Sequence, residues 1–169
     1  MLTILTGEDN KILRTPAKPV VNFDEKLADT VDLMVATMLN PDGQDVTGIG
    51  LAAPQVGITE QIIIVTLNVN TKKDPKIVVM MNPEILEASE ATTNYEEGCL
   101  SLPGAYGRVT RPAKVKVKWQ NINGNWCEKK FDKWDARIFL HEYDHLIGKM
   151  FVDYLSHKER AKLKDQGKL

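Results

Sequence analysis

The chain has 169 residues, of which 43% are hydrophobic and 27% charged, and its formal net charge is -1. This length and composition predict one globular domain over residues 1–169, large enough to bury a substantial core. The near-neutral charge argues against a nucleic-acid or anionic-membrane partner, so no specific nucleic-acid site is expected. No segment approaches the roughly 20 apolar residues of a membrane span, and the N-terminal residues lack the features of a signal or transit peptide. We therefore expect a cytoplasmic protein.

The first predicted element is a helix that begins after Asp24, a favourable N-cap residue. Apolar side chains recur at helical spacing from Leu27 to Met38, which indicates one buried face. The turn-forming residues 40–43 end this pattern.

Beyond Gly57 the pattern changes to short β-branched runs. Residues 61–67 and 76–81 are rich in Ile and Val, as is typical of strands, and Pro83 bounds the second run. Residues 114–119 alternate between Lys and apolar side chains, which predicts a strand with one buried face. Asn123-Gly124 then predicts a tight hairpin, with a return strand over 126–131.

Two further helices are predicted, at about residues 134–147 and 156–164, and Gly148 is a suitable residue to end the first. The order of elements contains no βαβ alternation. It predicts an α+β domain of mostly antiparallel sheets packed around a central helix over 134–147, with an N-terminal and a C-terminal helix.

The predicted central helix carries an HExxH pentad, residues 141–145. Positions i and i+4 of a helix share one face, so His141 and His145 can bind a single divalent cation. Glu142, next to the first of them, can take a proton from a water molecule that the cation activates. For the pentad alone, the alternative is a solvated, charged turn of helix.

A catalytic metal site usually has three protein ligands and one open position, so a third ligand is needed. The downstream candidates are Asp153, His157, Glu159 and Asp165. None falls in an extended zinc-protease pattern, because Phe151 stands where that pattern needs a His. Upstream, Cys99 lies in a glycine-flanked loop over 97–103 and would complete a site of one thiolate and two imidazoles. A buried, inert thiol is the alternative for Cys99.

Residues 48–57 form a third unusual stretch, rich in Gly and Ala. Small residues allow a backbone or a substrate to approach closely. The side-chain amide of Gln55 in this stretch could donate a hydrogen bond to an oxyanion. A purely structural turn is the alternative.

These three stretches, in this order, resemble the peptide deformylase family, which is marked by GxGLAAxQ, EGCLS and HExDH segments. Residues 48–55, 97–101 and 141–145 fill every signature position, and the resemblance extends over about residues 4–155. Leu140 departs from the family, in which Gln commonly precedes the first His. The departure puts in doubt a hydrogen bond behind a metal ligand.

The resemblance implies a hydrolase that removes the N-formyl group from the initiator Met of newly made polypeptides and releases formate. It implies Cys99, His141 and His145 as ligands of one divalent metal, with Fe(II) as the native ion and Zn, Ni or Co as alternatives. Glu142 would be the general base.

The resemblance also implies how the reacting group and the peptide are held. The Gln55 amide and the backbone N–H of Leu100 would bind the oxyanion. The expected substrate-binding residues are Ile49 and Gly50, which would pair with the peptide backbone in β fashion, together with Gly98 and with Ile138, which would line the pocket for the Met side chain.

Formylated nascent peptides are the implied partners, and the ribosome is a candidate partner through the basic C-terminal helix. An ion pair between Glu97 and Arg111 could support the site. Two rival functions remain open. A zinc endopeptidase would need a downstream third ligand, and a non-catalytic protein with a structural metal would need a fourth ligand, for which Cys127 is the most available residue.

Overall fold

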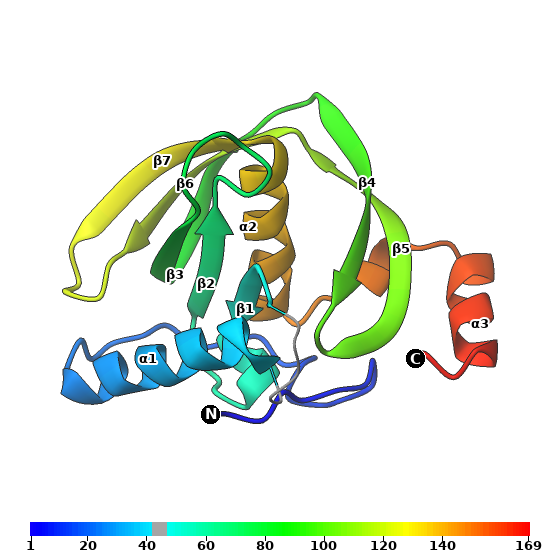
Figure 1. Ribbon diagram of the computed structural model, residues 1–169, viewed down its shortest axis with the longest axis horizontal. Helices are drawn as coiled ribbons and strands as arrows, with labels where there is room; N and C mark the ends of the chain where they lie inside the picture. Colours follow the sequence, from blue (N-terminus) through cyan, green and yellow to red (C-terminus); the bar gives the residue numbers. More distant parts are fainter. Residues whose placement is uncertain (42–46) are drawn as a thin grey trace.

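The structure is a computed structural model that describes residues 1–41 and 47–169 (Figure 1). In chain order its elements are α1 (Glu25–Leu39), β1 (Gly50–Ala52), the 3-10 turn η2 (Ala53–Val56), β2 (Ile62–Leu67), β3 (Lys76–Ala88), β4 (Thr92–Cys99), β5 (Leu102–Pro112), β6 (Lys114–Gln120), β7 (Trp126–Asp132), α2 (Lys133–Leu146), the 3-10 turn η3 (Phe151–Tyr154) and α3 (His157–Asp165). The predicted α+β class, with antiparallel sheets and a helix near each end, is confirmed.

The strands form two separate antiparallel sheets. Five strands pair in the order β1-β2-β3-β6-β7, and β4 pairs with β5. Helix α2 lies between the two sheets, with β1, β2, β6 and β7 on one side and β5 on the other (Figure 1). The HExxH pentad is part of α2, so its side chains are held between two rigid layers.

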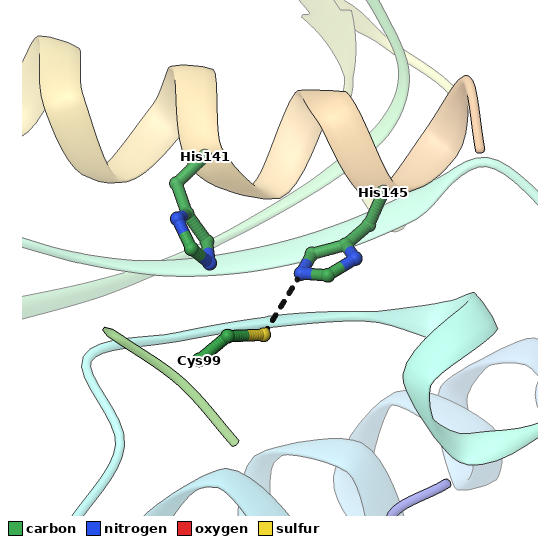
Figure 2. Close-up of side chains that lie close together, drawn as sticks. All are labelled: Cys99, His141 and His145. Carbon is green, nitrogen blue, oxygen red and sulfur yellow. Dashed lines mark hydrogen bonds between the residues drawn. The ribbon is translucent and has the colours of Figure 1, made fainter. Parts of the chain in front are cut away.

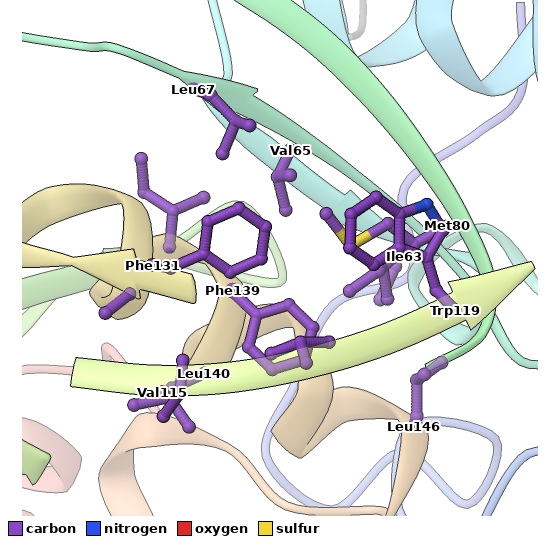
Figure 3. Close-up of a cluster of buried hydrophobic side chains, with 14 of the residues drawn as sticks. Ile63, Val65, Leu67, Met80, Val115, Trp119, Phe131, Phe139, Leu140 and Leu146 are labelled. Carbon is purple, nitrogen blue, oxygen red and sulfur yellow. The ribbon is translucent and has the colours of Figure 1, made fainter. Parts of the chain in front are cut away.

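Strand β2 shows why its sequence is a continuous apolar run. Ile62 and Ile64 pack into a cluster with residues of α1, whereas Ile63 and Val65 pack into a cluster that includes Phe139 of α2 (Figure 3). Successive side chains of a strand point to opposite faces. Both faces of β2 are covered by a helix, which accounts for the buried apolar run from Ile62 to Val65.

Leu140, the departure from the family sequence, belongs to the cluster around α2. Its side chain lies with Val115 and Phe131 among the buried residues of that cluster (Figure 3) and is 8% exposed. An apolar residue therefore fits this position by packing, and Leu140 adds to the core that holds α2 against the sheet.

Most predicted boundaries agree with the structure. Asp24 caps α1, because its side chain accepts the N–H of Leu27 at 3.0 Å, and the predicted segments for β2, β6, β7, α2 and α3 end within one residue of the observed ones. The hairpin at Asn123-Gly124 is confirmed, with Gly124 at φ 77°. The predicted turn at 40–43 reaches into residues 42–46, outside the described ranges.

The prediction that Pro83 ends the second strand is wrong. β3 continues to Ala88, because Asn82 adopts φ 51° and the register with β6 shifts between Met81 and Glu84. A proline is tolerated at such a bulge, where no ladder hydrogen bond is required of it. The Asn82 side chain bonds to both backbone groups of Val20, at 2.8 and 2.9 Å.

Strands β4 and β5 were not predicted, and residues 97–103 are not a free loop. They comprise the end of β4, a short turn and the start of β5. β4 carries the polar sequence TTNYEEGC and leaves most of its side chains exposed. It therefore shows no hydrophobic alternation by which a strand could be recognised. Within the described ranges, no helix combines the length and apolar character needed to cross a bilayer.

Candidate active site

Cys99, His141 and His145 come together between β4 and α2 (Figure 2). Cys99 ends β4, and the two histidines lie one turn apart on α2. Their ligand atoms all lie within 4.8 Å of one another, and Sγ of Cys99 is 3.3 Å from Nε2 of His145. Ligands of a tetrahedral metal are roughly 3–4 Å apart, given metal–ligand distances of about 2.0–2.3 Å. A thiolate and two imidazoles in this arrangement fit one zinc or ferrous ion.

The ring of His141 is oriented by a buried carboxylate. Oε2 of Glu97 lies 2.8 Å from Nδ1 of His141, and a proton on Nδ1 leaves Nε2 free to bind a metal. Burial by itself would raise the pKa of Glu97, but hydrogen bonds from Arg111 and His141 lower it to about 2. Glu97 is therefore ionised at neutral pH.

Two arginines balance the charge of Glu97. Arg111 donates to both of its carboxylate oxygens, at 2.6 and 2.9 Å, and Arg137 donates to Oε1 at 2.6 Å. The expected Glu97–Arg111 ion pair is thus confirmed. Arg111 also bonds to Asp144 of the pentad at 2.7 Å, and the hydroxyl of Tyr154 donates to the same carboxylate at 3.1 Å. The roles of Arg137 and Asp144 were not predicted.

Glu142 lies against the backbone of Gly50. A Cβ atom at position 50 would overlap the Glu142 carboxylate, so only glycine leaves room for it. Oε2 of Glu142 is buried and has no hydrogen-bonding partner in the described part of the chain. Burial raises the pKa of Glu142 to about 7. A carboxylate with such a pKa can accept and return a proton near neutral pH.

The side chain of Gln55 is fixed with its NH₂ group toward the thiol. Its Oε1 accepts the N–H of Ala52 at 2.8 Å, and its Nε2 lies 3.2 Å from Oγ of Ser101 and 3.4 Å from Sγ of Cys99. This orientation places a neutral donor beside the candidate metal ligands. Ser101 belongs to the EGCLS segment, but its contact with Gln55 was not predicted.

A cavity of about 540 Å³ opens beside these groups. Its lining includes Ile49, Gly50, Gln55, Gly98, Cys99, Leu100, Ile138, His141 and Glu142. The structure thus brings nine of the ten residues expected from the sequence to one cavity, and the tenth, His145, is buried next to Cys99.

The residues on which the rival functions depend lie elsewhere. Asp153 is paired with Arg14 at 2.6 Å, and His157 is exposed at the start of α3. Among the described residues, the cluster of candidate ligands contains Cys99 and two histidines but not Cys127, which lies on β7. Within the described ranges the cluster offers three candidate ligands, the number usual for a catalytic centre, whereas a structural centre usually has four.

Comparison with known proteins agrees with this geometry. The polypeptide deformylase family model matches residues 1–161. The peptide deformylase of Thermotoga neapolitana is 41% identical over 153 residues, which cover 90% of this chain and 87% of the relative. The crystal structure of peptide deformylase from Thermotoga maritima is similar with a TM-score of 0.82 and 40% identity, covering 92% of this chain and 98% of that one.

A plant enzyme extends the comparison. Peptide deformylase 1B from Arabidopsis thaliana has a TM-score of 0.86 and 35% identity, with 98% of this chain and 87% of that chain covered. The chain therefore belongs to the peptide deformylase family, the metal-dependent hydrolases that remove the N-formyl group from nascent peptides.

Proposed function

We propose that Cys99, His141 and His145 bind one divalent metal ion and that formylmethionine is deformylated in the adjoining cavity. The observation that carries this proposal is the position of Glu142, which is buried beside the ligand cluster with Oε2 unpartnered in the described residues. When bound, the metal polarises the formyl carbonyl and lowers the pKa of a water molecule. Fe(II) is the native ion in this proposal, because the resemblance implies it and the donor set accepts it.

Glu142 acts as the general base and then as the general acid. Its free Oε2 takes the proton of the attacking water and later delivers it to the leaving nitrogen, since an amine is expelled readily only when it is protonated. Nε2 of Gln55 and the backbone N–H of Leu100 donate hydrogen bonds to the oxyanion that develops on the formyl oxygen. Gln55 is 2% exposed, so its donor acts in a site that excludes most water.

The peptide lies as an added strand between two open strand edges. In the described part of the chain, β1 pairs with β2 alone and β4 with β5 alone, and residues of both β1 and β4 line the cavity. The carbonyl of Ile49 already accepts the N–H of Thr66 at 2.8 Å. Backbone groups alternate along a strand, so Gly50 directs its own groups to the open edge. We therefore assign backbone pairing to Gly50 and Gly98, and we replace the backbone pairing expected for Ile49 by side-chain contact, because its carbonyl is already bonded to Thr66.

Ile138 contributes to the pocket for the first side chain of the substrate. It is buried, lines the cavity and precedes His141 by one helical turn on the same element. An unbranched Met side chain of the substrate would lie against it in this inner part of the cavity. The apolar contact would help to place the formyl group at the metal.

The remaining parts of the proposal concern the setting of the enzyme. Residues 1–169 act as one domain in the cytoplasm, where nascent chains are made. Helix α3 exposes Lys158 and Lys162, which support ribosome binding through this helix by attraction to nucleic-acid phosphates. Charge-reversal variants at these two positions should weaken co-sedimentation with ribosomes, and unchanged co-sedimentation would remove this part of the proposal.

Metal content and formate release together test the site. After anaerobic loading with Fe(II), Cys99→Ser and His145→Ala are expected to lose the metal, whereas Glu142→Gln should keep it and lose activity. Cys127→Ser is the control and should keep both. Metal loss in Cys127→Ser would favour a structural centre, and normal turnover in Glu142→Gln would overturn the role of that residue.

A further inference from the structure

The cavity extends to both faces of β4. Glu97 points inward, to α2, where it contacts Arg137 and His141. Side chains of a strand alternate between its faces, so Glu96 and Gly98 lie on the outer face. The lining of the cavity includes both of these residues as well as Glu97. A peptide beside β4 therefore meets protein on two sides.

Strand alternation separates the first two side chains of the substrate. We place the start of the peptide at Cys99, where the formyl group meets the candidate metal ligands, and its path back along β4, antiparallel to that strand. The first side chain points inward, to Ile138. The second must then point to the outer face, because successive side chains of an extended strand take opposite faces.

Tyr106 of β5 lies beside Gly98, on the outer face of the sheet that β4 and β5 form. It is the cross-strand partner of Gly98, and its ring covers that glycine so closely that a Cβ at position 98 would lie 2.7 Å from the ring. Tyr106 is 61% exposed and lines the cavity. Since Gly98 has no side chain, nothing separates the ring from the side chain of a peptide residue on the other side of β4.

Glu96 adds a negative charge beside that ring. It lies two residues from Gly98 on the same outer face and is exposed. Its cross-strand partner Arg108 donates to the side-chain and backbone oxygens of Asn94, at 2.8 and 2.9 Å. Arg108 thus bonds to Asn94, and Glu96 has no ion-pair partner among the described residues, so its carboxylate can contact a ligand.

We propose that Tyr106 and Glu96 form a binding site for the second side chain of the formylated peptide and select a basic one. The aliphatic part of a Lys or Arg side chain lies on the Tyr106 ring, and its charged end reaches the Glu96 carboxylate. An acidic second residue is disfavoured by repulsion from Glu96. This inference rests on the proposed path of the peptide along β4, and it assigns to the site a preference beyond formylmethionine.

Steady-state kinetics on three peptides test the preference. The substrates are formyl-Met-Lys-Ser, formyl-Met-Ala-Ser and formyl-Met-Glu-Ser, and kcat/KM is measured at low and at high salt. At low salt we expect the Lys peptide to exceed the Glu peptide by roughly tenfold, mainly through KM, because exposed ion pairs and cation–π contacts are each of modest strength. At about 1 M salt the ratio should shrink, since screening then acts within about 3 Å.

Two variants and one control test whether Glu96 and Tyr106 produce the preference for a basic second residue. Glu96→Gln should reduce the Lys-to-Glu ratio to about twofold, and Tyr106→Leu should reduce the Lys-to-Ala ratio. Glu90→Gln removes an exposed carboxylate that does not line the cavity and should keep both ratios of the wild-type protein. These smaller factors follow from losing a single exposed contact.

Equal kcat/KM values for the three peptides, or an unchanged Lys-to-Glu ratio in Glu96→Gln, would overturn the inference. Either result would leave the deformylase function intact, because formate would still be released from formyl-Met-Ala-Ser. Absence of formate from all three peptides would instead overturn the proposed catalytic site, and this inference with it.

Discussion

The carboxylate of Glu97 holds the imidazole of His141, with Oε2 at 2.8 Å from Nδ1. Glu97 belongs to β4, and its charge is balanced by Arg111 of β5 and Arg137 of α2. The orientation of a candidate metal ligand thus depends on buried charges from three elements of the fold. A buried carboxylate in this position both fixes the ring and raises the basicity of its metal-binding nitrogen.

Replacing Glu97 by Gln should therefore weaken both the fold and the metal site. The substitution leaves the buried Arg111 and Arg137 with less compensating charge, which costs about 3–5 kcal/mol of unfolding free energy. Metal affinity should fall by about 10–100-fold. Urea unfolding and competition with a chromophoric chelator measure the two effects. Glu87→Gln, at an exposed position of β3, is the matched control, and equal behaviour of the two variants would contradict this account of Glu97.

Gln55→Leu isolates the oxyanion donor. Leu has a similar size but cannot donate a hydrogen bond, so kcat should fall by about 10²–10³. The metal content should stay at the wild-type level, since Gln55 is not among the candidate ligands. Single-turnover formate release on metal-quantified protein checks this expectation, and a wild-type rate would rule out the assigned role.

Gly50→Ala tests the space reserved for the general base. The added Cβ would overlap the Glu142 carboxylate, which must move away from its position beside the ligand cluster. A displacement of about 1 Å can cost about 10² in rate, so we expect a loss of this order with metal still bound. A variant that is folded, fully loaded and fully active would show that Glu142 tolerates the shift.

Leu140→Gln tests whether the family's common residue suits this core. Leu140 lies in the apolar cluster around α2, and a buried amide without a partner costs about 1–3 kcal/mol. Thermal and urea unfolding should show this loss, while formate release from the folded variant at 25 °C should match the wild-type rate. Equal stability of the variant would mean that the cluster offers the amide a partner.

The attachment of α3 should depend on pH through Glu8. Its carboxylate bonds to Arg160 and to Lys164, each at 2.7 Å. Burial acts to raise the pKa of Glu8, but these hydrogen bonds prevail and lower it from its ordinary value of 4.5. A lowered folded pKa contributes stability above pH 4.5, and that contribution is lost as the pH falls through the folded value.

Urea unfolding of the wild-type protein and Glu8→Gln measures this contribution. At pH 7 the wild-type protein should be more stable by about 1 kcal/mol, the upper range for partly exposed ion pairs. Below pH 4.5 the difference should decrease toward zero. A difference that is the same at pH 7 and at pH 3 would contradict the ionic attachment of α3.

The parts of the fold that could be predicted are those with periodic burial. α1, α2 and β6 each bury a regular set of apolar side chains, so their sequences show the period of the element. β4 does not, because it is polar and largely exposed. It is recognisable as a strand only through its pairing with β5. The extension of β3 through Pro83 was missed for a similar reason, since it depends on contacts between Asn82 and Val20 across 62 positions.

The residues of the candidate site likewise include some that a local sequence pattern predicts and others that it does not. His141 and His145 are specified by the spacing of one short motif, and helix geometry alone places them on one face. The hydrogen bonds that stabilise the surrounding site join residues far apart in the sequence. Arg137 meets Glu97 across 40 positions, and Gln55 meets Ser101 across 46. Such contacts follow from the packing of segments that lie far apart in the sequence, so a single sequence contains no pattern from which to derive them.

The most direct test of the central claim is formate release by the Fe(II)-loaded protein from formyl-Met-Ala-Ser, with acetyl-Met-Ala-Ser and the Glu142→Gln variant measured in parallel. This account predicts rapid release from the formyl peptide by the wild-type protein alone, and a loss of about 10²–10⁴ in Glu142→Gln at equal metal content. Comparable formate release by Glu142→Gln, or none by fully loaded wild-type protein, would contradict it.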